Sequence, residues 1–263
     1  MNLTTLQLPR RAEKPRETGL TMVIDGGLPL GHFTDLMSSA AEYIDVIKFG
    51  WGTAVVTGDL PAKIDVLDAH DIGWYFGGTL FEKFVLQGRF DDFRRFCLEY
   101  SCRRVEVSNG TIPMPNSEKA SYVRKLAGDF TVVSEVGFKD PVRSEQLPPS
   151  MWVEYIREDL EAGASLVTLE ARESGRSGIC RPDGAVRFGL IEDVLASGLS
   201  PRDLLFEAPT TALQTYFITR LGPDVNLGNV PAHGVLGLET LRLGLRADTL
   251  TAFETEATGA DRH

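Results

Sequence analysis

Eight short runs of apolar, largely β-branched residues recur along the 263-residue chain, and glycine, proline or asparagine bounds each of them. Continuous apolar runs of this length are typical of parallel strands that are buried on both faces. The repetition therefore predicts a parallel sheet with strands near residues 20–24, 44–49, 72–76, 104–108, 131–135, 166–170, 204–207 and 225–227.

Amphipathic stretches with helical spacing separate these runs. Phe33, Met37 and Ala40 share one helical face, and Phe93 and Phe96 belong to another, so we expect these side chains to pack against the sheet. No G-x-G-x-x-G follows the first strand, which argues against a dinucleotide-binding fold. Eight strand–helix repeats in about 250 residues favour an α/β fold of the (β/α)8 TIM-barrel type over an open, doubly wound sheet.

We divide the chain into three parts. Residues 1–18 are polar and contain Pro9 and Pro15, so we expect an N-terminal arm on the surface or on a partner subunit, with disorder as the alternative. Residues 19–250 are expected to form the barrel, and residues 251–263 a C-terminal tail. The sequence contains neither an apolar leader nor a run long enough to span a membrane, so we expect a cytoplasmic protein without a membrane partner.

The charge balance restricts the partners. The chain carries 37 acidic and 27 basic residues, a formal net charge of −10, so nucleic acid is not an expected partner. An anionic ligand would need positive charge concentrated locally. Cys97, Cys102 and Cys180 show no CxxC spacing, which argues against a disulfide framework or a zinc site.

Polar and charged residues follow the ends of most predicted strands. In a parallel barrel these ends meet at one mouth, where catalytic residues collect. A charged group at the end of a buried strand is costly unless it meets a partner or a ligand. The set therefore predicts one site, although any single carboxylate could instead stabilise the rim through a salt bridge. Its members are Asp25, Lys48, Glu106, Asn109, Glu135, Lys139, Glu170, Arg172, Ser174, Gly175, Glu207, Asn226, Gly228 and Asn229.

The residue types suggest separate roles. The carboxylates are hard oxygen donors suited to Mg²⁺, which normally binds only one or two of them in a protein, so the others must pair with cations. Lys139 and Lys48 are the candidate proton donors, and Glu135 joins them as a catalytic candidate. The candidate metal ligands are Asp25, Glu106, Glu170 and Glu207.

Two loops are candidates for binding an oxyanion. The loop after the sixth strand offers Arg172, Ser174 and Gly175, which combine a guanidinium, a hydroxyl and backbone N–H groups. The segment after the eighth strand, a common phosphate-binding region of this fold, contains Asn226, Gly228 and Asn229. The sequence lacks both G-x-S-x-G and a Walker loop, so it supports neither acyl transfer nor nucleotide hydrolysis.

These segments, taken together, resemble the phosphosulfolactate synthase family of coenzyme M biosynthesis, which includes a plant heat-stress-associated branch. The resemblance spans nearly the whole chain in order. It rests on EKPRETGLTMVIDGG (13–27), YIDVIKFGWGTA (43–54), GGTLFE (77–82), VEVSNGTI (105–112), SEVGFKD (134–140), EARESG (170–175), LLFEAP (204–209), VNLGNV (225–230) and LETLRLGLRADT (238–249).

The resemblance implies a (β/α)8 barrel, expected to be a homo-oligomer, that adds sulfite to C3 of phosphoenolpyruvate with Mg²⁺ to give (2R)-phospho-3-sulfolactate. Sulfite attack would create an enediolate, which a metal ion and cations stabilise, and a lysine would then protonate C2. The sequence departs from the family pattern twice, because Asn109 replaces an expected aspartate and Phe138 an expected lysine. The alternatives are therefore a paralogue with a different nucleophile and a non-catalytic, stress-related barrel.

Overall fold

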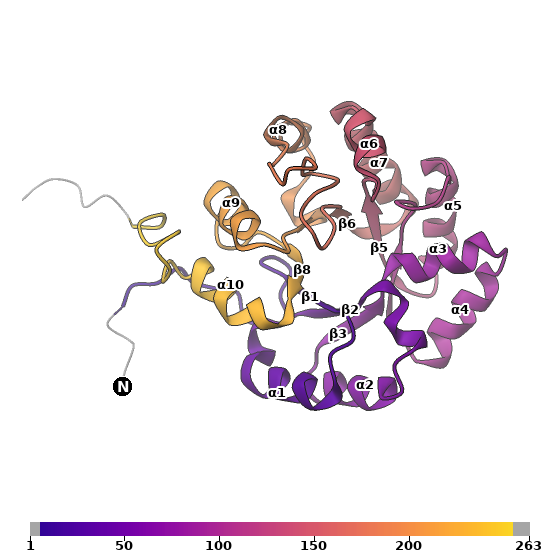
Figure 1. Cartoon of the computed structure of the whole chain (residues 1–263), viewed down its shortest axis with the longest axis horizontal. Helices are drawn as coiled ribbons and strands as arrows, with labels where there is room; N and C mark the ends of the chain where they lie inside the picture. The colour runs from indigo at the N-terminus through magenta and orange to yellow at the C-terminus, as the bar shows by residue number, and fades with distance from the viewer. Residues whose placement is uncertain (1–5, 255–263) are drawn as a thin grey trace, which may run out of the picture.

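The computed structural model describes residues 6–254 and shows eight parallel strands surrounded by helices (Figure 1). The hydrogen-bonded order is β3-β2-β1-β8-β7-β6-β5-β4, so the sheet curls until β3 and β4 become neighbours. The predicted TIM barrel is confirmed, with a seam between β3 and β4. The strands are β1 (Thr21–Asp25), β2 (Val46–Phe49), β3 (Gly73–Phe76), β4 (Arg104–Val107), β5 (Thr131–Val136), β6 (Ala164–Leu169), β7 (Leu204–Glu207) and β8 (Leu227–Pro231).

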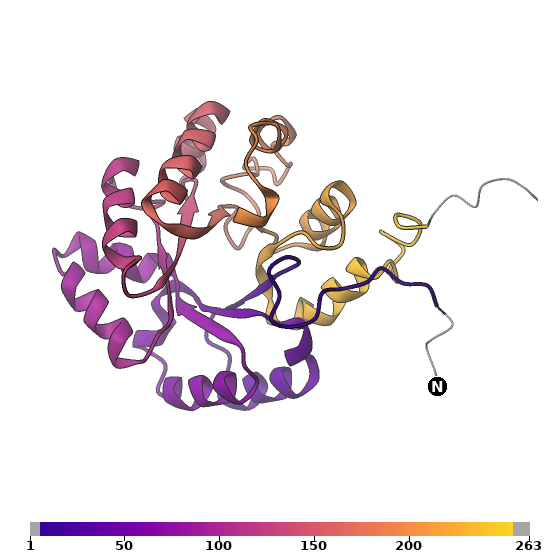
Figure 2. The ribbon, with the colours of Figure 1, turned by 180° about the vertical axis from the view of Figure 1, so that it is seen from behind.

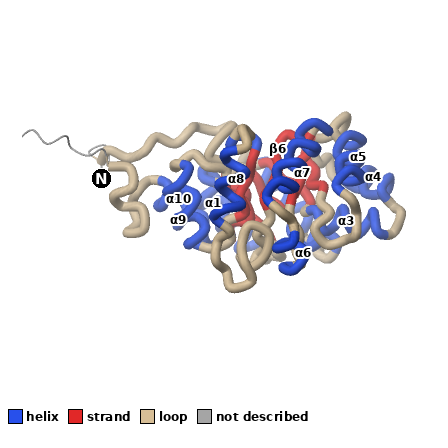
Figure 3. The backbone as a smooth tube through the Cα atoms, turned by 90° about the horizontal axis from the view of Figure 1, so that it is seen from above, coloured by secondary structure: helices blue, strands red, loops and turns tan. Residues whose placement is uncertain are grey.

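Helices enclose the strands on the outside of the barrel (Figure 3). They bury the apolar faces expected from the sequence, since Phe33, Met37 and Ala40 are all buried on α1, and Phe93 is buried on α4. None of the helices in residues 6–254 is both long and apolar enough to cross a membrane. The helices are α1 (Leu30–Ala40), α2 (Leu60–Ala69), α3 (Gly78–Leu86), α4 (Phe90–Glu99), α5 (Asn116–Leu126), α6 (Pro141–Gln146), α7 (Pro149–Ala162), α8 (Phe188–Ala196), α9 (Thr211–Leu221) and α10 (Val235–Arg242).

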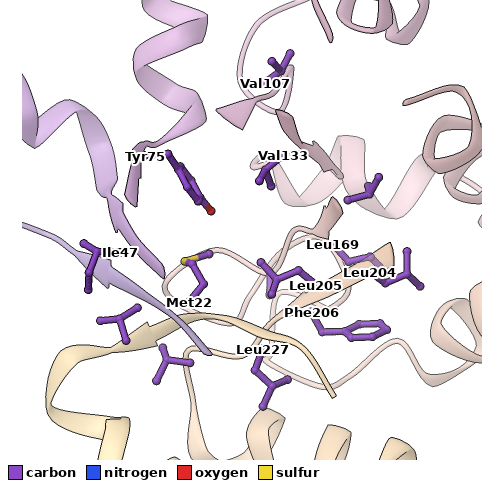
Figure 4. Packing of buried hydrophobic residues seen from close by; sticks show 14 of the residues in the cluster. Met22, Ile47, Tyr75, Val107, Val133, Leu169, Leu204, Leu205, Phe206 and Leu227 are labelled. Atoms are coloured by element: carbon purple, nitrogen blue, oxygen red, sulfur yellow. The ribbon is translucent and has the colours of Figure 1, made fainter. Parts of the chain in front are cut away.

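Strand pleating sorts the side chains of the sheet into two sets. Met22, Tyr75, Val133 and Leu205 point into the barrel, whereas Phe206 and others on the opposite pleat face the helices (Figure 4). Successive residues alternate between the two sides, so the residues two positions further along each strand also face inward. This alternation decides which of the charged strand-end residues enter the barrel mouth.

The boundary of β8 differs from the prediction. The apolar run at 225–227 suggested the strand, but β8 begins at Leu227 and continues through Gly228 and Asn229 to Pro231. Glycine, asparagine and proline favour turns, which hid the true strand in the sequence. A proline is tolerated here because the pairing of β8 with β7 ends at Gly228, so Pro231 interrupts no ladder on that side.

The N-terminal arm, as far as it is described, has no regular secondary structure and runs past α10 towards β1 (Figure 2). Arg11 holds it to the barrel through Asp224 at 2.7 Å and Glu239 at 3.0 Å. Arg16 pairs with Asp45 at 3.0 Å. The arm thus lies against the amino-terminal end of the barrel, away from the ends where strands β1 to β8 finish. Most of the predicted tail at 251–263 lies outside the described residues.

Candidate active site

A cavity of about 200 Å³ opens at the carboxyl-terminal ends of the strands. Its charged lining comes from β2, β4 and β5 and from the loops after β5 and β6. The structure therefore gathers residues as far apart in the chain as Lys48 and Asn229 around one hollow. Among the residues of the predicted site, this lining contains Lys48, Glu106, Glu135, Lys139, Glu170, Arg172 and Asn229.

Lys48 lies at the centre of the acidic residues. It points inward from β2, and its Nζ lies 3.0 Å from Glu106, 3.4 Å from Glu135 and 3.6 Å from Glu207. Burial alone would lower the pKa of Lys48, but Glu106, Glu135 and Glu207 together raise it well above its usual value. Lys48 is therefore a fixed positive charge inside the barrel.

Lys139 approaches the same acids from the loop after β5. Its ammonium lies 2.9 Å from Glu135 and also contacts Glu170. Glu135 and Glu170 raise the pKa of Lys139 well above its usual value, against the lowering effect of burial. Its side chain is 26% exposed, compared with 7% for Lys48, so Lys139 is the lysine that a bound substrate can reach.

Three glutamates form a compact acidic cluster. One carboxylate oxygen each from Glu135, Glu170 and Glu207 lies within 4.8 Å of the other two. Burial, followed by repulsion from Glu135 and Glu207, raises the pKa of Glu170 well above its usual value. Burial would also raise the pKa of Glu135, but Lys139 and Lys48 hold it below the usual range. Lys48 and Lys139 offset part of the negative charge of the cluster, and hard oxygen donors this close together fit a divalent cation such as Mg²⁺.

Glu106 and Glu207 are held by backbone groups. Glu106 accepts a hydrogen bond from the Gly78 N–H at 2.5 Å, and its pKa is raised, mainly by burial. Glu207 accepts from the Ala171 N–H at 2.8 Å and from the Asn229 side chain, and so lies directly behind the cavity wall. Both carboxylates are fully buried, which fixes their orientation relative to Lys48.

Arg172 is positioned by an unusual backbone conformation. Its φ of 58° lies in the left-handed region, which is costly for a residue with a Cβ. This conformation aims its N–H at Glu170 at 2.5 Å, and its Nη1 donates to the Lys139 carbonyl at 3.3 Å. Within residues 6–254, its buried Nε lacks a hydrogen-bond partner. Nη2 lies 3.4 Å from Glu173, so among the described residues Nη1 and Nη2 each make one contact and each keep a second N–H with which to bind an anion at the rim.

The rest of the loop after β6 plays a different part. Ser174 is exposed outside the cavity, and Gly175, at φ 64°, supplies a turn that other residues adopt only with strain. Ser177, further along the same loop, is buried and holds the loop in place by donating to the Phe138 carbonyl at 2.7 Å. These placements make Arg172, rather than Ser174 or Gly175, the ligand-facing member of this loop.

Two of the predicted strand-eight residues lie elsewhere. Asn226 precedes β8, where it accepts from the Leu20 N–H at 3.0 Å and donates to the Leu204 carbonyl at 3.1 Å, so it ties strands together at the opposite end. Gly228 faces the barrel interior, where a Cβ would lie 2.9 Å from both Leu205 and Met22. The expected placement of these two residues at the mouth is therefore wrong, because the strand begins later than predicted.

The expected placement of Asp25 at the mouth is also wrong. Asp25 is on the opposite pleat from the inward-facing Ile24, so it points towards α2, where Lys63 pairs with it at 2.6 Å. Its other oxygen accepts from the N–H groups of Gly27 and Leu28. Lys63 was missed in the sequence, although a lysine beside apolar residues on one helical face is a signal for such a buried pair.

The two departures from the family pattern lie outside the cavity lining. Asn109 is buried and donates to the Met114 carbonyl at 2.9 Å, so it shapes the loop after β4. Phe138 packs beneath the Arg143 guanidinium, 4.1 Å from its ring centre. Glu82, also missed in the sequence, braces the same region by accepting from Ser108 at 2.5 Å. The ring of Phe138 therefore does not narrow the space available to substrate in the described structure.

Comparison with known proteins identifies the family of the chain. The family model described as (2R)-phospho-3-sulfolactate synthase (ComA) matches residues 9–248. A phosphosulfolactate synthase from Bacillus subtilis is 51% identical over 249 residues, covering 95% of this chain and 99% of that protein. Another, from Methanothermobacter thermautotrophicus, is 41% identical over 258 residues, covering 95% and 98%. The Arabidopsis thaliana protein HEAT-STRESS-ASSOCIATED 32 is a more distant relative, at 24% identity with 88% of both chains covered.

Solved structures support the fold alone. The 3-hexulose-6-phosphate synthase of Salmonella typhimurium aligns with a TM-score of 0.52 at 14% identity, over 86% of this chain and 100% of its own. The YdjI aldolase of Escherichia coli K12 aligns with a TM-score of 0.53 at 12% identity, over 90% and 89%. By the extent and identity of the sequence matches, the chain belongs to the (2R)-phospho-3-sulfolactate synthase family of enzymes.

Proposed function

We propose that this protein adds sulfite to C3 of phosphoenolpyruvate and forms (2R)-phospho-3-sulfolactate with Mg²⁺. One observation carries the proposal: Lys48, Lys139 and Arg172 meet Glu106, Glu135 and Glu170 around a single small cavity. Two anionic substrates can be held side by side only where cations offset their repulsion. The identity to two phosphosulfolactate synthases supports the choice of substrates.

The reaction needs a proton at C2, and Lys139 is the residue that would donate it. The sulfur lone pair of sulfite forms the C3–S bond, and the π electrons of the C2–C3 double bond move to C2 and into the carboxylate as an enediolate. Protonation of C2 then completes the addition, and no group leaves. Lys139 enters the reaction protonated because Glu135 and Glu170 raise its pKa, and its partly exposed ammonium can reach C2.

The remaining residues bind and orient. Arg172 would hold the phosphate or sulfonate through its guanidinium. Glu135 orients the Lys139 ammonium at 2.9 Å, and Lys48 offsets the charge of the buried glutamates. Glu135, Glu170 and Glu207 would hold Mg²⁺, with one or two as direct ligands. When bound, this ion would supply positive charge to stabilise the negative charge that develops on the substrate carboxylate.

Phosphorus NMR tests this function. The purified protein is incubated with phosphoenolpyruvate and Mg²⁺, with or without sulfite, and the enol-phosphate signal is followed. We expect the signal to disappear only in the presence of sulfite. Loss of the signal with another nucleophile but not with sulfite would contradict the choice of nucleophile. Failure to bind phosphoenolpyruvate would favour a non-catalytic barrel.

Removal of the metal should stop the reaction. Treatment with EDTA is expected to abolish sulfite-dependent consumption of phosphoenolpyruvate, and excess Mg²⁺ should restore it, because Glu135, Glu170 and Glu207 leave carboxylate charge for a cation to offset. Initial rates across a Mg²⁺ titration measure the effect. An EDTA-treated enzyme that keeps its full rate would rule out the metal requirement.

Substitution of Arg172 tests the anion site. Arg172→Ala should raise KM for phosphoenolpyruvate roughly ten- to hundredfold, since a charge-assisted hydrogen bond contributes about 1.5–3 kcal/mol. Arg176→Ala is the matched control, because Arg176 is exposed on the same loop. Initial rates at varied phosphoenolpyruvate give both values. An unchanged KM in Arg172→Ala would refute the assigned role.

A further inference from the structure

A second cavity lies at the opposite mouth of the barrel. It measures about 780 Å³ and opens between the starts of the strands and residues 14–17 of the arm. Its floor is apolar, because Met22, Val133 and Leu205 close the barrel interior at this level (Figure 4). Small-molecule sites combine apolar surface with polar groups that fix the orientation of the ligand, and this cavity has an apolar floor and charged walls.

The half-buried part of the wall carries excess positive charge. Lys14, Arg16 and Arg104 line it, against the single half-buried carboxylate Asp45. Both oxygens of Asp45 are already used, one by Arg16 at 3.0 Å and the other by the Thr21 N–H at 2.8 Å. Among residues 6–254, no carboxylate oxygen lies within 4.0 Å of the charged nitrogens of Lys14 or Arg104.

The exposed rim does not cancel this excess. Glu17, Asp68 and Asp71 stand there together with Arg103 and Arg202, and all five are exposed. Water and salt screen such surface charges strongly, whereas half-buried charges are screened much less. The inner wall therefore determines which ligand charge the cavity favours, and that charge is negative.

Arg104 is built into this wall. It begins β4 at the seam with β3, and its Nη1 lies against the backbone of Gly73, where a Cβ would be only 2.2 Å away. The absence of a side chain at Gly73 thus makes room for the guanidinium. Lys14 donates to the Ala41 carbonyl at 2.8 Å, and burial is the main cause of its lowered pKa.

Tyr75 connects this cavity to the other mouth. Tyr75 lines the cavity at the amino-terminal mouth, and its hydroxyl donates to Glu106 at 3.4 Å. Glu106 in turn pairs with Lys48 in the candidate active site. A ligand that contacts the Tyr75 ring would therefore be one side chain away from the acidic residues of the active site.

We propose that the amino-terminal mouth is a second binding site, for a small anion that carries an apolar group. The apolar part would lie on Met22, Val133 and Leu205, and the anionic head would pair with Arg104 and Lys14. This site uses none of the residues assigned to phosphoenolpyruvate or sulfite, so it stands independently of the proposed reaction.

The test uses the fluorescent probe 8-anilinonaphthalene-1-sulfonate, which combines an aromatic body with a sulfonate. We expect the full-length protein to bind it, and Arg104→Met to raise its Kd at least tenfold. The uncharged analogue N-phenyl-1-naphthylamine should bind both proteins equally, which separates lost charge from lost structure. Arg89→Met, which changes an exposed arginine outside the lining of this cavity, is the control and should leave both Kd values unchanged.

A second variant keeps the proposal testable if Arg104→Met fails to fold. Lys14→Met removes the other cation from the arm without altering a strand, and should weaken binding of the sulfonate probe severalfold. Equal Kd values for the sulfonate in the wild type and in both variants would overturn the proposal. Loss of sulfonate binding in Arg172→Ala would also overturn it, by placing the probe at the opposite mouth.

Discussion

Replacing Lys139 with alanine is expected to lower kcat for sulfite addition by about 10²–10⁴-fold, the usual contribution of a general acid. The reason is that Lys139 combines a protonated ammonium with the exposure needed to reach C2 of the substrate. Stopped assays with phosphoenolpyruvate and sulfite measure the loss. Lys83→Ala is the matched control, because Lys83 is exposed on α3 and should leave kcat unchanged.

A second substitution distinguishes proton donation from simple charge. Lys139→Arg keeps a cation beside Glu135 and Glu170, but a guanidinium does not release its proton at the pH of the reaction. We expect this variant to remain as slow as Lys139→Ala. Recovery of most of the rate in Lys139→Arg would show that position 139 acts only through its charge and would leave Lys48 or water as the proton donor.

Asp25→Ala is expected to lower the free energy of unfolding by about 3–5 kcal/mol, since it leaves a buried lysine without its partner. Asp25 and Lys63 are each about 1% exposed, so water cannot replace the lost contact. A loss of this size is a large part of the stability of a typical domain, about 5–15 kcal/mol. Urea denaturation measures the change. Asp65→Ala is the control, because Asp65 is exposed on α2, the helix that carries Lys63, and its replacement should have little effect.

A double substitution isolates the ion pair from the turn that Asp25 also holds. In Asp25→Asn the side chain can still accept from Gly27 and Leu28, so its effect reports mainly the lost charge. Replacing Lys63 with methionine in that background removes the unpaired cation and should recover part of the stability. If Asp25→Ala costs less than about 1 kcal/mol, the pair is not the stabilising contact described here.

Much of the barrel and its charged mouth could be predicted because their signals are regular. Buried parallel strands appear as continuous apolar runs, and charges at their carboxyl ends meet at one place whatever the loops between them do. Lys48, Glu106, Glu135, Lys139 and Glu170 were found in this way, and the structure brings them together. Their individual roles remain predictions that the variants above test.

The residues whose positions were predicted wrongly lie where an error of one or two positions along a strand changes the place of the side chain. Asp25 follows Ile24 by one position, and that one step turns its side chain from the barrel interior to the helices. Asn226 was misplaced because turn-forming residues disguised β8. The cavity at the amino-terminal mouth had no sequence signal. Arg104 and Lys14 are 90 positions apart and line the same cavity only because the arm lies against the amino-terminal end of the barrel.

Carbon NMR with phosphoenolpyruvate labelled with ¹³C at C3 tests the central claim most directly, because it observes the atom at which the new bond forms. With Mg²⁺, sulfite and the wild-type protein, we expect the olefinic C3 signal to be replaced by that of a saturated CH₂ group bonded to sulfur. An olefinic signal that persists, or one that becomes the methyl signal of pyruvate, would contradict the account.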